Sequence, residues 1–212
     1  SGIRWLLFNI YDFRLGDKHM IRQTISDVVL SIHETCMNET AFAKGEDAVR
    51  LPNRGEIIGL IKDLRRVIFP GYFGEEHLSD VVPDYFLGNM LTDIYRRLST
   101  QIEMALMYRM KGSAEEAAVK AEAGRICNAF IGKIPEIQKA LLMDVQAAFD
   151  GDPAADSKED IIFSYPGLFA IYVYRMAHEL YLMKVPFIPR IMTEYAHNKT
   201  GIDINPGATI GH

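Results

Sequence analysis

The residues TGIDINPGATIG, at positions 200–211, have a pattern unlike that of the rest of the chain. Ile204 and Ile210 lie six residues apart, with glycine and other small residues between them. An aliphatic side chain repeated at this interval is typical of a β-helix, in which each face contributes one inward residue per turn. One repeat by itself is weak evidence, so from the spacing alone a β-helix at residues 201–212 is one interpretation of this pattern.

Residues 20–200 instead repeat their apolar side chains at helical intervals. Apolar residues recur every three or four positions, which places them on one face of a helix. The segments with this spacing are 21–36, 57–68, 84–110, 137–149, 166–180 and 188–199. No strong period of two interrupts them, so we expect residues 20–200 to form an all-α multi-helix domain. The long helix at 84–110 should pack against several others or against a partner chain.

Capping residues and helix breakers predict where these helices begin and end. The segments 53–56 (NRGE) and 113–116 (SAEE) have the spacing of a capping box, so each predicts a helix start. Pro135 suits the first turn of a further helix, and Gly151 suits the position just after its end. Two helices are therefore expected between 116 and 150.

The last part of the helical region is divided by similar signals. Ser157 is expected to cap a short helix that runs to residue 163, and Pro166 to start the next one. Gly201 should stop a final helix that covers about 188–199. A polar loop is expected at 38–52.

Composition favours a globular protein and limits its partners. The chain has 212 residues, of which 49% are hydrophobic and 24% are charged, which is enough for a substantial core. Its net charge of −5 argues against nucleic acid or an anionic membrane as a partner. Cys36 and Cys127 lack metal-site spacing and suggest reduced, buried thiols in a cytoplasmic protein. No apolar run approaches the ~20 residues of a membrane span.

Both ends of the chain resemble cut ends. The clean helical pattern begins near Met20, and the segment 5–8 (WLLF) is too short for a signal-peptide core. We therefore expect residues 1–19 to be a non-native or disordered extension.

The acidic segment 150–156 (DGDPAAD) has two interpretations. It is either a solvated turn whose carboxylates complement the dipole of the next helix, or a turn that presents one carboxylate to a pocket. Asp152 precedes a proline, which favours an extended backbone and projects its side chain away from the helix. An anionic carboxylate in that position suits the binding of an amine.

The segment 174–181 (YRMAHELY) is equally ambiguous by itself. Arg175 and Glu179 are spaced as an i,i+4 pair, which usually means a surface ion pair. His178 is then a packed or capping histidine, because nothing local marks it as a base. A metal pair with His197 would require a coincidence of fold, so no metal site is expected.

Together these motifs resemble the serine O-acetyltransferase family of bacterial and plant cysteine synthesis. The motifs DPAA, YPG, YRMAHELY and TGIDINPGATIG occur here in that order, between 152 and 211. Further upstream, LRRVIFPGYFG at 64–74 and LLMDVQAAFDGDPAA at 141–155 resemble the branch with longer N-termini. The resemblance covers residues 20–211, and it is most specific after residue 141.

The resemblance implies a fold, a reaction and partners. A helical domain, here 20–200, precedes a left-handed parallel β-helix of hexapeptide repeats, which begins at 201–212. That β-helix forms trimers, which the helical domains commonly join into hexamers. The family transfers the acetyl group of acetyl-CoA, its co-substrate, to the hydroxyl of L-serine. Its C-terminal tail binds cysteine synthase, also called O-acetylserine sulfhydrylase.

Two site residues follow from the resemblance, position by position. Asp152 matches the aspartate that binds the amino group of serine. Asp203 matches the aspartate that orients the catalytic histidine and stabilises its imidazolium. That histidine belongs to an Asp-His-Gly segment that this sequence lacks, and His212 does not correspond to it. The groove for acetyl-CoA is also absent, so this chain should bind no cofactor and be inactive alone. Asn205 stands where the family usually has histidine.

Two other functions stay open from the sequence. The helical domain could be an oligomerisation or interaction module, with the helix at 84–110 as its contact surface. Alternatively, the chain could come from another hexapeptide-repeat acyltransferase with a different acceptor.

Overall fold

The computed structural model describes residues 18–38, 50–74, 83–110 and 115–211, and the chain divides into two units, residues 1–48 and 49–212. The first unit contains helix α2 (Lys18–Asn38). The helices of the second unit are α3 (Arg54–Ile68), α4 (Pro83–Arg109), α5 (Glu116–Gly151), α6 (Lys158–Ser164), α7 (Pro166–Leu182) and α8 (Ile188–Thr200). No strand occurs within the described residues, which confirms the expected all-α domain. None of these helices is long and apolar enough to cross a membrane.

The apolar stripe of helix α2 is exposed. Ile21, Ile25, Val28 and Ile32 are each between 50% and 58% accessible. They lie on one face of the helix because their spacing follows its period of 3.6 residues. The extension expected at 1–19 lies outside the described residues except for its last two positions, which already belong to α2.

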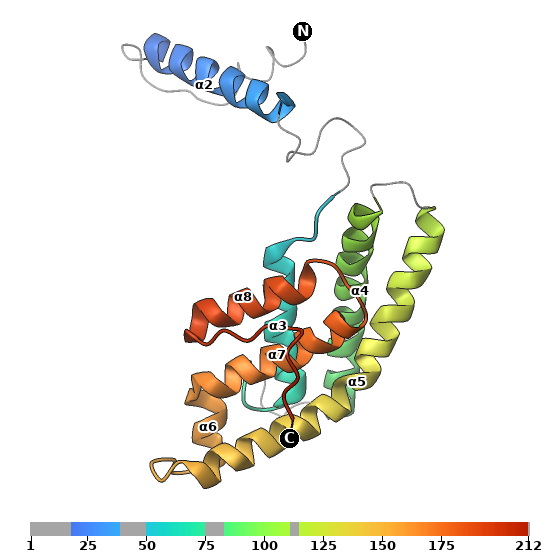
Figure 1. Cartoon of the computed structure of the whole chain (residues 1–212), viewed down its shortest axis with the longest axis vertical. Helices are drawn as coiled ribbons and strands as arrows, with labels where there is room; N and C mark the ends of the chain where they lie inside the picture. The colour runs from blue at the N-terminus through green and yellow to red at the C-terminus, as the bar shows by residue number, and fades with distance from the viewer. Residues whose placement is uncertain (1–17, 39–49, 75–82, 111–114, 212) are drawn as a thin grey trace. The chain divides into compact units, whose positions relative to one another are not determined.

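The core of the second unit lies where α3, α4, α5, α7 and α8 meet (Figure 1). Its largest fully buried side chains are Tyr172, Phe130, Ile57, Ile61, Leu64, Ile68, Ile94, Ile102, Leu106, Ile126, Leu141 and Ile161. The Tyr172 hydroxyl donates a hydrogen bond to the carbonyl oxygen of Ile61 (2.5 Å), so this buried polar group is satisfied. Burial raises the pKa of Tyr172 well above its ordinary value, and the hydroxyl stays protonated.

The apolar stripe of α4 is used inside this unit. Ile94, Leu98 and Ile102 are at most 2% accessible, and α4 packs against both α3 and α5. The long helix expected at 84–110 is thus confirmed, and its neighbours within the chain account for its apolar face. This leaves that face unavailable as a contact surface for a partner.

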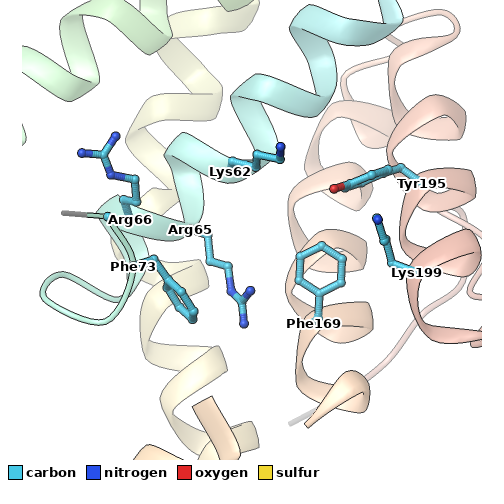
Figure 2. A pocket seen from close by; sticks show the side chains of 8 residues that line it. Lys62, Arg65, Arg66, Phe73, Phe169, Tyr195 and Lys199 are labelled. Carbon is cyan, nitrogen blue, oxygen red and sulfur yellow. The ribbon is translucent and has the colours of Figure 1, made fainter. Parts of the chain in front are cut away.

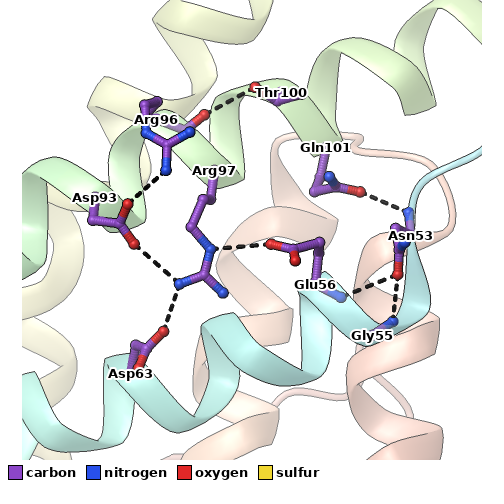
Figure 3. Close-up of polar contacts among 9 residues, drawn as sticks. All are labelled: Asn53, Gly55, Glu56, Asp63, Asp93, Arg96, Arg97, Thr100 and Gln101. Atoms are coloured by element: carbon purple, nitrogen blue, oxygen red, sulfur yellow. Dashed lines mark hydrogen bonds and ion pairs between the residues drawn. The ribbon is translucent and has the colours of Figure 1, made fainter.

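Arg97 of α4 binds two carboxylates of α3, Glu56 and Asp63, and a third on its own helix, Asp93 (Figure 3). Its Nη1 donates to Asp63 Oδ2 (2.6 Å) and to Asp93 Oδ2 (3.1 Å), and its Nε donates to Glu56 Oε2 (3.1 Å). A Cβ atom at Gly59 would lie 2.7 Å from Arg97 Nη2, so glycine leaves room for the guanidinium. The network sets the distance between the two helices on their solvent side.

Half of the capping box predicted at 53–56 is present (Figure 3). Asn53 Oδ1 accepts hydrogen bonds from the backbone N–H groups of Gly55 (2.8 Å) and Glu56 (3.2 Å), so Asn53 caps α3. The prediction that the Glu56 carboxylate accepts from the Asn53 N–H is wrong, because that carboxylate accepts from Arg97 instead. The Asn53 N–H donates instead to Gln101 Oε1 of α4 (2.7 Å).

Helix α5 continues through Pro135, so the prediction that a separate helix starts there is wrong. Phe130 and Leu141, on either side of the proline, are fully buried on one stripe. Their packing offsets the hydrogen bond that Pro135 cannot donate. Ser113 of the second predicted capping box lies outside the described residues, and the N-cap position of α5 is Glu115, without a side-chain cap.

The predicted signals of the last part are confirmed. Ser157 Oγ accepts a hydrogen bond from the Asp160 N–H (3.1 Å) at the start of α6, and Pro166 begins α7. Gly201 ends α8 in the left-handed conformation (φ 74°), as glycine does at a helix C-terminus. The described residues 201–211 form no strand, so the first coil of a β-helix stays a prediction.

Candidate functional site

Asp152 stands at the point where α5 ends. It is the C-cap residue of α5, because Gly151, expected just beyond the helix, is its last helical residue. Asp152 Oδ2 accepts a hydrogen bond from the Tyr165 hydroxyl (2.6 Å), and Oδ1 accepts one from the Ala154 N–H (2.9 Å). Both carboxylate oxygens are therefore held by donors from the turn and from the start of α7.

These donors keep Asp152 ionised. The hydrogen bond from Tyr165, followed by that from the Ala154 N–H, lowers the pKa of Asp152 below its ordinary value. The same hydrogen bond raises the pKa of Tyr165 to about 12, so the hydroxyl stays a donor at neutral pH. Each carboxylate oxygen retains lone pairs, and the side chain is half-buried. The site can therefore receive a cationic group such as an ammonium.

Helix α7 holds the segment that follows α8. The Tyr174 side chain is buried; its hydroxyl donates to the Ala208 carbonyl oxygen (2.6 Å) and accepts from the Ile210 N–H (3.2 Å). His178 Nδ1 lies 2.8 Å from the carbonyl oxygen of Pro206. A carbonyl can only accept, so Nδ1 carries the proton. The histidine thus anchors this segment.

Arg175 ties α7 to α5 and to the end of this segment. Its Nε and Nη2 donate to the two carboxylate oxygens of Asp144 (2.7 and 2.8 Å), and Nη2 also donates to the Gly211 carbonyl oxygen (3.3 Å). The prediction of an ion pair between Arg175 and Glu179 is wrong. The planar guanidinium of Arg175 instead donates two parallel hydrogen bonds to the Asp144 carboxylate on the facing helix, α5. A tertiary contact replaces the local one.

A tight turn sits between these anchors. Asn205 Oδ1 accepts from the Gly207 N–H (2.8 Å), and the Asn205 carbonyl oxygen accepts from the Ala208 N–H (3.0 Å). Asparagine is suited to this side-chain turn, and the following Pro206 is buried. A Cβ at position 207 would lie 2.9 Å from the Tyr181 ring of α7, so a larger residue would require the exposed Tyr181 side chain to move. Asn205 therefore has a structural role in this chain.

The two predicted site residues lie in different surroundings. Asp152 is tightly held, whereas Asp203 is exposed and its side chain makes no hydrogen bond or ion pair with the described residues. No contact joins the two aspartates in the described part of the chain. No cluster of three or more histidine, cysteine, aspartate or glutamate side chains that could hold a metal occurs there either.

Sequence reasoning missed three residues of this arrangement. Tyr165, Tyr174 and Asp144 all lie in motifs that the sequence singled out, but none was given a role. Asp144 and Arg175 lie 31 positions apart, and Tyr165 lies 13 positions after Asp152. No local spacing rule connects such pairs, because the packing of α5 against α7 brings them together.

Solved structures with a similar fold define the class of protein. Serine acetyltransferase 1 from Entamoeba histolytica aligns with 86% of this chain and 62% of its own, with a TM-score of 0.58 and 25% identity. The same enzyme in complex with L-cysteine aligns with a TM-score of 0.58 and 26% identity. The described helices therefore have the fold of the helical part of an acetyltransferase.

Relatives in sequence give the particular family. A plasmid serine acetyltransferase from Synechococcus elongatus is 42% identical over 165 residues, which are 76% of this chain and 52% of the relative. The serine acetyltransferase of Bacillus subtilis is 45% identical over 73 residues, or 34% of each chain. No family model matches the sequence.

The matches cover the N-terminal part of these relatives. The chain is thus homologous to the N-terminal part of serine acetyltransferases, which confirms the resemblance seen in its motifs. It spans about half the length of the first of these relatives.

Proposed function

We propose that this chain is the helical part of a serine O-acetyltransferase, which transfers the acetyl group of acetyl-CoA to the hydroxyl of L-serine. The product, O-acetyl-L-serine, is the first intermediate on the way to cysteine. The observation that carries the proposal is the geometry of Asp152, in a chain 42% identical to a serine acetyltransferase over 165 residues. Tyr165 and Ala154 hold its carboxylate ionised and leave lone pairs for a ligand.

Asp152 binds the ammonium group of serine in this proposal. A carboxylate that is already held by two donors loses little side-chain freedom when the substrate binds, so its position is set in advance. The interaction with an ammonium is charge-assisted and anchors serine at the end opposite to its reacting hydroxyl.

Asp203 is proposed as a positioning residue. It orients the histidine that acts as general base. That histidine lies in the part of the related enzymes that this chain does not cover. The exposed carboxylate of Asp203, free of partners among the described residues, is consistent with that role. The acetyl-CoA site belongs to the same uncovered half, so we propose that this chain holds neither cofactor nor co-substrate and is inactive by itself.

Partners and location follow the family. We propose trimers or hexamers of the whole protein, a cytoplasmic location, and contact with cysteine synthase through a C-terminal tail that this chain does not cover. Neither nucleic acid nor a membrane is expected as a partner.

The test joins this chain to the remaining half of the Synechococcus relative and measures CoA release with serine. The variant Asp152→Asn should raise the KM for serine at least about tenfold, because a neutral amide loses the charge-assisted bond to the ammonium. The matched control is Asp150→Asn, two residues earlier, whose carboxylate accepts a hydrogen bond from Gln146 and from no other described residue. A well-folded hybrid without serine-dependent CoA release would refute the proposal.

Asp203 needs a different readout, since it acts through another residue. In the same hybrid, Asp203→Asn should lower kcat and shift the acidic limb of the pH–rate profile, with little change in the KM for serine. A loss confined to KM would contradict the positioning role. A different acceptor is tested by replacing serine with homoserine or threonine; a higher kcat/KM for either would favour another acyltransferase.

A second candidate function, an assembly module, is favoured by one observation. The apolar stripe of α2 is exposed over several turns, and such a stripe usually marks a contact surface. We therefore place the predicted oligomerisation surface on α2 rather than on α4, whose stripe faces its own core.

A further inference from the structure

A hollow of about 420 Å³ opens between α3, α7 and α8. Asp152 is not among the residues that line it. Among its lining residues are Lys62, Arg65, Phe73, Phe169, Tyr195 and Lys199. They contribute several cations, no carboxylate, and aromatic side chains. The hollow lies within the second unit, and its volume falls in the range of small-molecule sites, which is about 300–1,000 Å³.

Three cations of this hollow lack an anionic partner among the described residues. Lys62, Arg65 and Lys199 form no ion pair with any described carboxylate, whereas Arg97 and Arg175 elsewhere in the unit are paired. Cations gathered on one surface repel each other unless an anion lies between them. The chain as a whole has a net charge of −5, so its average composition would not lead one to expect a cluster of unpaired cations.

The arrangement of these groups suits an oxyanion (Figure 2). Lys62 on α3 and Lys199 on α8 extend into the same gap, and the Tyr195 hydroxyl lies beside them. The Arg66 guanidinium points away from this gap, so it takes no part in the site. Amines on opposite walls with a hydroxyl between them can surround a phosphate group from several sides.

Arg65 lines the hollow beside Phe73 and is held in place there. Its guanidinium carbon lies 3.7 Å from the centre of the Phe73 ring and 5.1 Å from that of Phe169, and both distances are within the range of a cation–π interaction. Its Nη2 donates to the Ile162 carbonyl oxygen (3.1 Å). Burial lowers the pKa of Arg65, which shows that the charge is partly desolvated without a carboxylate to compensate it. A fixed cation of this kind binds an anion with little loss of side-chain entropy.

We propose that this hollow binds an organic phosphate of nucleotide type. Lys62, Arg65 and Lys199 contact its phosphate oxygens, and Phe169 with Tyr195 packs against its planar base. The proposal does not rest on the acetyltransferase function, because no side chain of this hollow hydrogen-bonds to the Asp152 carboxylate, whose donors are Tyr165 and the Ala154 N–H.

The experiment titrates the complete 212-residue chain with ADP, pyrophosphate and adenosine by calorimetry. ADP should bind saturably at low salt with a Kd below about 1 mM, and more weakly at high salt, since ion pairs with phosphate are screened. Pyrophosphate should bind more weakly than ADP because it lacks the base, and adenosine should not bind because it lacks the phosphates.

The variant for the test is Lys62→Gln with Lys199→Gln, two exposed side chains whose loss leaves the core intact. Its affinity for ADP should fall at least about tenfold, since two charge-assisted contacts are removed. The matched control is Lys120→Gln with Lys139→Gln, two exposed lysines of α5, which should bind as the parent does. Circular dichroism checks that both variants are folded.

Each opposite outcome overturns the proposal. Absence of ADP binding to the parent chain refutes the site. Equal affinity for adenosine refutes phosphate recognition, and equal affinity for pyrophosphate refutes the contact with the base. An equal loss in both double variants means that ADP responds to net charge alone and not to this hollow.

Discussion

A single hydrogen bond distinguishes Asp152 from the other acids of its turn. Within the described part of the chain, Asp150 accepts a hydrogen bond only from Gln146 on its own helix, whereas Asp152 accepts one from the Tyr165 hydroxyl at the start of α7. That bond fixes the carboxylate against the helix that follows and stabilises its ionised form. At the scale of one residue, Tyr165 is therefore the partner that prepares Asp152 for a cation.

The first prediction concerns this bond. In Tyr165→Phe, the pKa of Asp152 should rise towards the ordinary aspartate value, because the main cause of its lowering is removed. The change should be partial, since the Ala154 N–H still donates. The measurement is a ¹³C NMR titration of the Asp152 carboxyl carbon on the acid side of pH 5.

The sign of the linked stability is also determined. A carboxyl whose pKa is lower in the folded chain stabilises the fold above its unfolded pKa, and this contribution is lost as pH falls through the folded value. Tyr165→Phe should therefore reduce the loss of stability on acidification. The control is Tyr85→Phe, an exposed tyrosine. An Asp152 titration identical to that of the parent would contradict the prediction.

At the scale of elements, α7 does more than fill the core. One face of α7 buries Val173, Met176 and Leu180, while Tyr174 and His178 turn polar atoms towards the segment after α8. Those atoms satisfy backbone groups that a strand would otherwise pair. The segment is thus held without regular secondary structure of its own.

Tyr174→Phe should release this segment. It removes the hydrogen bonds to the Ala208 carbonyl oxygen and the Ile210 N–H, which together stabilise the segment by about 1–2 kcal/mol. Hydrogen exchange of the amides at 208–211 should therefore become about five- to thirtyfold faster. The control is Tyr108→Phe, whose hydroxyl has no partner among the described residues. Unchanged exchange at 208–211 would show that Tyr174 does not anchor the segment.

Another element-scale prediction concerns the start of α3. Asn53→Ala removes the acceptor that caps the Gly55 and Glu56 N–H groups, so the free energy of unfolding should fall by about 1 kcal/mol. Urea unfolding measures it, with Asn198→Ala on exposed α8 surface as the control, which should change little. If the two variants were equally stable, the Asn53 cap would contribute nothing.

For the molecule as a whole, the exposed apolar stripe of α2 is the surface that bears on assembly. Among the exposed aliphatic side chains of this helix, Ile32 lies within the stripe and Leu30 lies on the opposite face. If the stripe is an interface between copies of the chain, only the first of these positions should matter to assembly.

Ile32→Asp should therefore reduce the mass of the protein in solution to that of one chain, because a buried carboxylate without a partner is costly. Leu30→Asp makes the same change on the other face and should leave the assembly intact. Light scattering after size exclusion gives both masses. A parent chain that is already a strict monomer would exclude assembly through α2, and an equal effect of both variants would exclude the stripe as its location.

Much of the fold could be predicted from local signals. The caps at Asn53 and Ser157, the start at Pro166 and the stop at Gly201 were all placed correctly. Each of these helix ends depends on atoms only a few residues apart in the chain, so the local sequence determines it. At Pro135 the local signal predicts the wrong structure, because packing on both sides of the proline outweighs a lost hydrogen bond.

The candidate site could be predicted only as far as motifs and spacing reach. By itself the sequence determined an all-α domain from its periodicity, its kinship with serine acetyltransferases from its motifs, and Asp152 as a candidate from both. Only the tertiary structure decided that Arg175 binds Asp144 rather than Glu179, that Tyr165 holds Asp152, and that unpaired cations gather between α3 and α8. The reason is physical: these contacts join residues far apart in the chain, and the crossing of helices sets their distances.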